Sequence, residues 1–155
     1  MDGGCLTTFL LIWDASDTGY PPDRRAADIA ATTAGKPVTG RWSFGSRRGG
    51  AAPGDRVFLL RQRSDRGIVA SGTLADGVIF PAAHWQGHAA KSTYYAEVRW
   101  ERVVPVADRL PFEELLHDVP GHDWHHIYGS GQRVRPPADE ALQRRWAEHL
   151  ADLRR

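Results

Sequence analysis

Hydrophobic and polar residues alternate most regularly over Thr93–Val104. Tyr94, Ala96, Val98 and Trp100 fall on one face of an extended chain, while tyrosine, glutamate and arginine residues occupy the other face. A period of two residues is typical of a β-strand that buries one face and leaves the other in solvent. The segment is therefore predicted to be a half-buried antiparallel strand.

Three further segments are predicted to be strands, because they are rich in apolar and β-branched residues and are bounded by turn residues. They are Cys5–Trp13, Asp55–Arg63 and Gly67–Ala75. The short polar connection Ser64–Arg66 between the last two predicts a β-hairpin, which starts a meander. The glycine-rich stretch Lys36–Gly54 leads into a Pro-Gly-Asp turn signal and is predicted to be a loop.

Three segments are predicted to be helices. The residues Pro21–Asp23 suit a helix start and open an alanine-rich helix that runs to about Ala34. A short helix is predicted over Phe112–His117. Ala138–Leu153 has the pattern of an amphipathic helix, with three leucines and Trp146 on one stripe, so that Trp146 is expected in the core.

The order of these elements predicts the fold class. A chain of 155 residues is about the size of one domain, so residues 1–155 are expected to form a single fold. Short strands, one early helix and a late helix indicate an α+β domain. We expect a small, twisted, partly closed β-barrel with peripheral helices and a C-terminal amphipathic helix, because closure of short strands removes exposed edges.

The basic residues are concentrated in one part of the chain, although the net charge is only +1. Seven arginines and two aspartates lie between Arg41 and Arg66, which gives a local excess of +5. A balanced protein with one basic stretch is suited to an anionic partner such as nucleic acid. Arg47, Arg48, Arg61 and Arg66 are the candidates for contacts with its backbone, because a guanidinium group binds phosphate through a rigid fork.

Several classes of protein are disfavoured. A single cysteine, Cys5, excludes an internal disulfide and a cysteine-cluster zinc site. The apolar run Leu10–Trp13 is far too short to span a membrane, so a cytoplasmic location is expected. No P-loop, dinucleotide-binding motif or nucleophile elbow is present, so neither a cofactor nor a catalytic role is expected.

The six tryptophans are the most suggestive residues. Periodicity assigns Trp100 and Trp146 to the core. The other four lie at strand ends or in loops, each close to a polar residue: Trp13, Trp42, Trp85 and Trp124. An extruded nucleobase needs flat stacking walls and a few polar groups for its edge, so these positions are candidates for a base pocket.

A set of short motifs resembles a known family. The motifs are Trp42-Ser43, GDRVFLLRQ over 54–62, RGIVASG over 66–72, His84-Trp85, and Trp124 followed by Gly129-Ser130-Gly131. In this order they are similar to the EVE-like domains of the PUA-like superfamily, which stand before HNH nuclease modules in modification-dependent restriction enzymes. The similarity runs from Trp13 to Trp146.

The resemblance implies a PUA-like barrel that binds an extruded modified base, typically 5-methylcytosine or a related cytosine in double-stranded DNA. By the same resemblance, the pocket walls are Trp13, Trp42 and Trp124. The groups that read the base edge or position a phosphate are Ser43, Arg61 and Ser130. Asp14 also belongs to this pocket, where it replaces the more usual asparagine; an ionised carboxylate only accepts hydrogen bonds, whereas an amide also donates. A nuclease supplied by another chain is a possible partner.

Two alternatives stay open. PUA-like barrels also bind RNA, so an RNA reader is the first alternative. The second is a small metal-dependent hydrolase built on residues 117–126, which contain four histidines and two aspartates. Their spacing matches neither the HExxH motif nor a zinc finger, and no metal site is expected.

Overall fold

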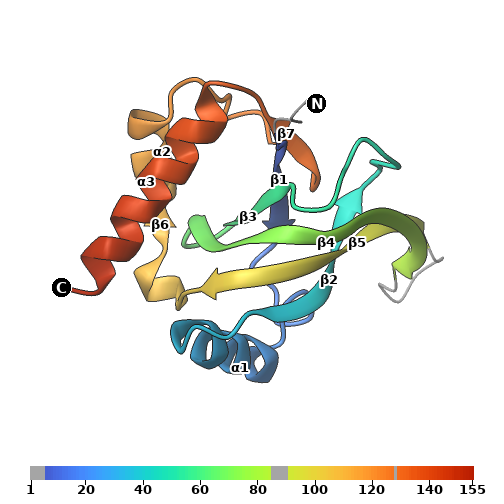
Figure 1. Ribbon diagram of the computed structural model, residues 1–155, viewed down its shortest axis with the longest axis horizontal. Coiled ribbons are helices and arrows are strands. Elements are labelled where there is room, and N and C mark those ends of the chain that lie inside the picture. The colour runs from blue at the N-terminus through green and yellow to red at the C-terminus, as the bar shows by residue number, and fades with distance from the viewer. Residues whose placement is uncertain (1–5, 85–90, 128) are drawn as a thin grey trace.

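A computed structural model of the protein describes residues 6–84, 91–127 and 129–155, with the backbone alone for 82–84 and 91–93 (Figure 1). The strands are β1 (Thr8–Trp13), β2 (Val38–Gly45), β3 (Arg56–Arg61), β4 (Gly67–His84), β5 (Lys91–Val103), β6 (Leu110–Pro111) and β7 (Gln132–Val134). The helices are α1 (Pro22–Thr33), α2 (Phe112–Asp118) and α3 (Ala138–Leu153), with a 3-10 turn at Val106–Asp108.

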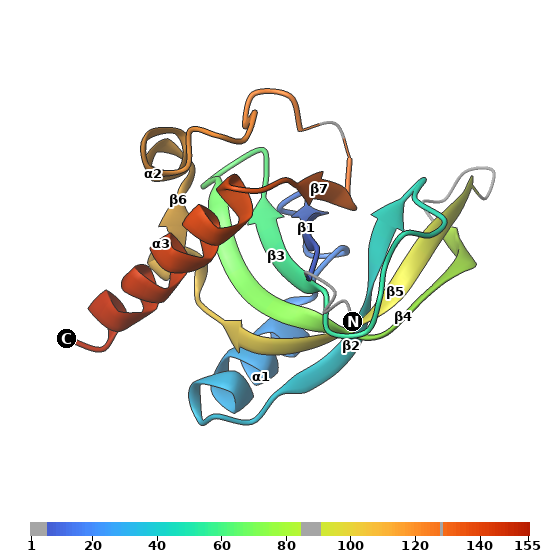
Figure 2. The ribbon, with the colours of Figure 1, turned by 45° about the horizontal axis from the view of Figure 1, so that its top comes forward.

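Within the described residues, the strands form one curved sheet of seven strands in the order β2-β5-β4-β3-β1-β7, with β6 paired to β4 (Figure 2). The predicted meander is present, because β3, β4 and β5 pair antiparallel in succession. β1 runs parallel to β3, so the chain crosses over between them through α1 and β2. The chain is an α+β protein, as the order of its elements predicts.

The alternation along β1 separates two hydrophobic clusters. Phe9, Leu11 and Trp13 face the first cluster, which also includes Ile29 of α1. Leu10 faces the second cluster, which lies between the sheet and the helices α2 and α3. In Figure 1, α2 and α3 lie side by side on one side of the sheet and α1 lies apart from them. Neighbouring residues of one strand therefore serve two different cores.

The prediction of a loop over Lys36–Gly54 is wrong for its first half. Residues Val38–Gly45 form β2, which pairs antiparallel with β5 from Val38 opposite Trp100 to Gly45 opposite Tyr94. Glycine disfavours strands when a segment is considered alone, but here pairing with a neighbouring strand and burial of Phe44 outweigh that preference.

The amphipathic helix is confirmed with its predicted bounds, Ala138–Leu153. Trp146 is buried, and its indole Nε1 donates a hydrogen bond to Ser71 Oγ at 2.8 Å. Beside Ser71, the register between β4 and β5 shifts at Gly72, which marks a β-bulge. A Cβ at Gly72 would lie 2.2 Å from the Arg99 carbonyl oxygen, so only glycine fits there. No helix among the described residues is long and apolar enough to cross a membrane.

Candidate nucleic-acid interface

β1 and β2 approach each other without a ladder of backbone hydrogen bonds, and side chains join them instead. Ile12 N donates to Ser130 Oγ at 3.0 Å, and the same hydroxyl donates to the carbonyl oxygen of Ser43. Trp42 Nε1 donates to the Ile12 carbonyl oxygen at 3.0 Å. We call these contacts of Ile12, Trp42, Ser43 and Ser130 the seam, because they close the curved sheet on itself.

Two glycines allow the loop before β7 to pack against the end of β2. Gly45 and Gly131 both have positive φ angles, of 61° and 88°. A Cβ on Gly45 would lie 2.8 Å from the Ser130 carbonyl oxygen, and one on Gly131 would lie 2.7 Å from that of Phe44. Both the backbone conformation and the available space therefore require glycine at these positions.

A cleft of about 550 Å³ opens beside the seam, between the turn after β2 and the segment that leads into β7. Its lining residues are Gly45, Ser46, Arg47, Arg48, Gly49, His126, Gly129, Ser130, Gly131 and Gln132. The structure thus brings together three of the predicted site residues, Arg47, Arg48 and Ser130, from segments about eighty residues apart.

The two arginines of the cleft are held in place by aromatic rings. Arg47 Nε donates to the Gly131 carbonyl oxygen at 2.8 Å, and its guanidinium carbon lies 5.0 Å from the ring centre of Phe9. The guanidinium of Arg48 lies 5.4 Å from the ring centre of Tyr94. Such cation–π contacts orient a charged group without neutralising it. The cleft therefore presents two positive charges to an anion.

Trp13 lies at the end of β1 and is closed off from solvent, with 1% of its surface exposed. The guanidinium carbons of Arg61 and Arg25 lie 4.4 and 4.8 Å from the centre of its ring. Tyr20 packs against Trp13 edge-to-face and donates a hydrogen bond to the buried Asp28. Burial and this carboxylate raise the pKa of Tyr20 above its ordinary value. A base could stack on Trp13 only after an arginine moved away.

Trp42 is half-buried and packs edge-to-face against Tyr20 and Trp100. Trp124 does not join it. The indole of Trp124 is 2% exposed, belongs to the second cluster and donates to the Val119 carbonyl oxygen at 2.8 Å, directly after α2. The expectation that Trp13, Trp42 and Trp124 wall one pocket is therefore corrected, because the sheet separates Trp124 from the other two.

The remaining predicted residues lie outside the cleft lining. Arg66 donates to Gln62 Oε1 at 2.7 Å, and its guanidinium carbon lies 3.6 Å from the ring centre of Phe112. Asp14 is exposed and accepts a hydrogen bond from the backbone of Ser16, and its contacts with Ser16 lower the pKa of this carboxyl group. Trp85 and the side chain of its neighbour at position 84 lie outside the described residues.

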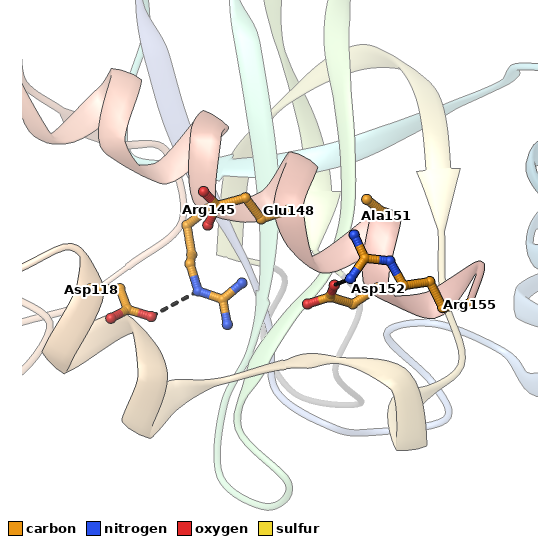
Figure 3. Close-up of a pocket in the computed structure, with 6 residues that line it drawn as sticks. All are labelled: Asp118, Arg145, Glu148, Ala151, Asp152 and Arg155. Atoms are coloured by element: carbon orange, nitrogen blue, oxygen red, sulfur yellow. Dashed lines mark hydrogen bonds and ion pairs between the residues drawn. The ribbon is translucent and has the colours of Figure 1, made fainter.

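The histidine-rich stretch is divided among separate contacts. His117 and His126 each bond a carboxylate through Nδ1, at 2.7 Å to Asp118 and 2.6 Å to Asp123. Within the described part of the chain, no three histidine, cysteine or acidic side chains are placed to hold a metal ion. The second oxygen of Asp118 accepts a hydrogen bond from Arg145 at 2.8 Å, which ties α3 to α2 beside a surface pocket (Figure 3).

Sequence reasoning missed two groups at this site, the backbone of Ile12 and the side chain of Gln132. An apolar run such as Leu10–Trp13 does not reveal that the backbone of Ile12 binds side chains from β2 and from the segment before β7. Gln132 follows directly on Gly129-Ser130-Gly131, and its position next to that motif is the signal that could have placed it in the site.

No protein-family model matches the chain, and no curated protein matches its sequence. Among solved structures, the fold is similar to a crystal structure of a mutant of the ZmASCH protein from Zymomonas mobilis. The TM-score is 0.53 at 9% sequence identity, and the match covers 88% of this chain and 96% of that chain. This likeness shows that the two proteins share a fold. The predicted α+β fold, with a twisted sheet and a C-terminal helix, is confirmed.

Proposed function

We propose that this PUA-like chain is a nucleic-acid-binding module that reads a modified base, 5-methylcytosine or a related cytosine in DNA. The observation that carries the proposal is the cleft beside the seam, where Arg47 and Arg48 face Ser130. A pocket that accepts one extruded nucleotide needs cationic groups for its phosphates and polar groups for the base edge. The resemblance of the sequence motifs to EVE-like domains supports the choice of a modified cytosine.

In this proposal each group has a separate task. Arg47 and Arg48 bind the phosphates that flank the extruded nucleotide, and their guanidinium planes offer surfaces on which a base can stack. Ser130 holds the shape of the cleft through the seam. Trp42 also supports the seam. Its indole donates a hydrogen bond to the carbonyl oxygen of Ile12, whose amide donates to the Ser130 hydroxyl.

The proposal is tested by a binding panel. One duplex carries cytosine, 5-methylcytosine, 5-hydroxymethylcytosine or N6-methyladenine at a single central position. We expect the tightest binding to a duplex with a modified cytosine. Equal affinity for all four duplexes would contradict base reading. Competition with an RNA of the same sequence tests the alternative that the protein reads RNA, because contacts to the 2′-hydroxyl let a protein distinguish RNA from DNA.

We further propose that the chain binds without cutting, and that any cleavage is performed by a nuclease on another chain. The purified protein should leave modified and unmodified DNA intact in the presence of Mg²⁺, Mn²⁺ or Zn²⁺. Metal-dependent cleavage that is lost in the variants His125→Ala or His126→Ala would contradict this proposal and show that the chain is an enzyme.

A further inference from the structure

Among the described residues that line the cleft, Gln132 is the one with an amide side chain, and it is the first residue of β7. Its side-chain oxygen Oε1 is buried and accepts no hydrogen bond from the residues that the structure describes. Two contacts position its backbone: Gln132 is the register partner of Leu10, and the preceding residue, Gly131, accepts the hydrogen bond from Arg47.

A buried acceptor without a donor is unfavourable, because it has lost its hydrogen bond to water and gained none in the protein. A ligand in the cleft that brings an N–H donor, and towards which the Gln132 side chain turns, removes that cost, whereas a ligand that brings an oxygen leaves the cost in place and adds repulsion. Arg47 and Arg48 offer donors only, so they respond to phosphate whichever base is present. Gln132 is therefore a lining group whose unpaired acceptor can distinguish one base edge from another.

We infer that Gln132 selects an extruded base that carries an exocyclic amino group. Cytosine presents an N4 amino group and adenine an N6 amino group at the position where thymine presents the O4 oxygen. The inference rests on the proposed function and adds a specificity-determining residue to it. Modified cytosines keep this amino group, so Gln132 accepts them and rejects thymine, which carries the same 5-methyl group as 5-methylcytosine.

The pair of 5-methylcytosine and thymine isolates this effect, because the two bases share the methyl group and differ at position 4. Each is placed opposite an abasic site in the same duplex, so that neither has a partner base to lose on extrusion. We expect the wild-type protein to bind the 5-methylcytosine duplex about 5- to 150-fold more tightly than the thymine duplex. The variant Gln132→Leu should bring this ratio close to one.

Two further variants make the result specific. Gln132→Glu keeps an acceptor oxygen and should retain the preference for 5-methylcytosine. Gln143→Leu is the matched control, because Gln143 also has a buried amide atom that no described residue pairs with, but lies in a different groove, on α3. It should leave the ratio as in the wild type, and a thermal melt of each variant verifies folding.

The outcomes separate this inference from the proposed function. A preference for 5-methylcytosine over thymine that persists in folded Gln132→Leu would overturn the role of Gln132 and leave the proposed function standing. Equal binding of 5-methylcytosine, cytosine and thymine duplexes by the wild type would overturn both. Loss of the preference in Gln132→Leu, with the preference retained in Gln143→Leu, supports both.

Discussion

The indole Nε1 of Trp42 donates a hydrogen bond to the carbonyl oxygen of Ile12 at 3.0 Å, across a gap that no backbone ladder bridges. The amide of the same Ile12 donates to Ser130 Oγ. The peptide groups of one residue in β1 are thus bound by side chains from β2 and from the segment before β7. This arrangement makes the position of Ser130 in the cleft dependent on Trp42.

Replacement of Trp42 should therefore affect stability and binding together. Trp42→Ala removes a half-buried aromatic side chain and should lower the free energy of unfolding by roughly 3–5 kcal/mol, which corresponds to a fall in Tm of roughly 6–20 °C. Trp42→Phe keeps an aromatic ring but loses the hydrogen bond to Ile12 and part of the packed indole, and it should lower the free energy of unfolding by roughly 1–3 kcal/mol. Thermal melts and affinities for a modified duplex measure both effects.

The matched control for Trp42 is Trp146→Phe, which loses one indole hydrogen bond to Ser71 in the second cluster. It should lower Tm and leave the ratio of modified to unmodified binding unchanged. If Trp42→Ala instead reduced that ratio without any fall in Tm, Trp42 would stack directly on the base, and its role in the seam would be secondary.

The salt dependence of binding reports the phosphate contacts of the cleft. Each phosphate neutralised contributes about −0.9 to the slope of log Kobs against log salt concentration. Arg47→Gln and Arg48→Gln should each make the slope less negative by about 0.9, and the double variant by about twice that. Arg144→Gln removes the same charge from the exposed face of α3 and serves as the control. If the slope became less negative by the same amount in all three single variants, the phosphate contacts would not be concentrated in the cleft.

Stability should depend on pH through His122. Burial lowers the pKa of this half-buried imidazole below its ordinary value near 6.5, and its ring packs 4.8 Å from that of Trp124. At pH values between the folded and the unfolded pKa of His122, the unfolded chain binds more protons than the folded chain. The neutral, buried His122 therefore contributes its full share of the folding free energy above about pH 6.5, and this contribution is lost as the pH falls further.

Thermal melts at pH 7.5 and 5.5 measure this loss. His122→Gln should show a smaller fall in Tm between these two pH values than the wild type shows. If His122→Gln gave the wild-type fall, the pH dependence would have another origin.

The bulge in β4 should tolerate no side chain at Gly72. A Cβ there would lie 2.2 Å from the Arg99 carbonyl oxygen and 2.9 Å from Trp100 Cα, both of which belong to the backbone of β5. Gly72→Ala must therefore push two paired strands apart, at a cost of roughly 1–3 kcal/mol or more. At Gly49 a Cβ meets nothing within 4 Å, so Gly49→Ala should change the free energy of unfolding by less than about 0.5 kcal/mol in urea titrations.

Local patterns in the sequence determined the elements whose signal repeats over several residues. The amphipathic helix Ala138–Leu153 could be predicted with its bounds, because its stripe of leucines with Trp146 recurs with the helical period. The strand ending at Val103 and the hairpin between β3 and β4 follow from alternation and turn residues in the same way. The choice of Arg47, Arg48 and Ser130 as site residues followed from local charge and from the motifs that resemble EVE-like domains, without their positions in space.

Only the tertiary structure decided which of these residues meet. Trp42 and Trp124 look alike in sequence, since each is an aromatic residue beside a polar one near the end of an element. Pairing of Val38–Gly45 with β5 places Trp42 in the cluster that contains Trp13, while the turn after α2 places Trp124 on the other face of the sheet. The contact between Arg47 and Gly131 joins residues 84 positions apart. Such contacts depend on the register and curvature of the whole sheet. Register and curvature result from many weak preferences of segments that are distant in sequence, so no short stretch of sequence is enough to predict the contacts.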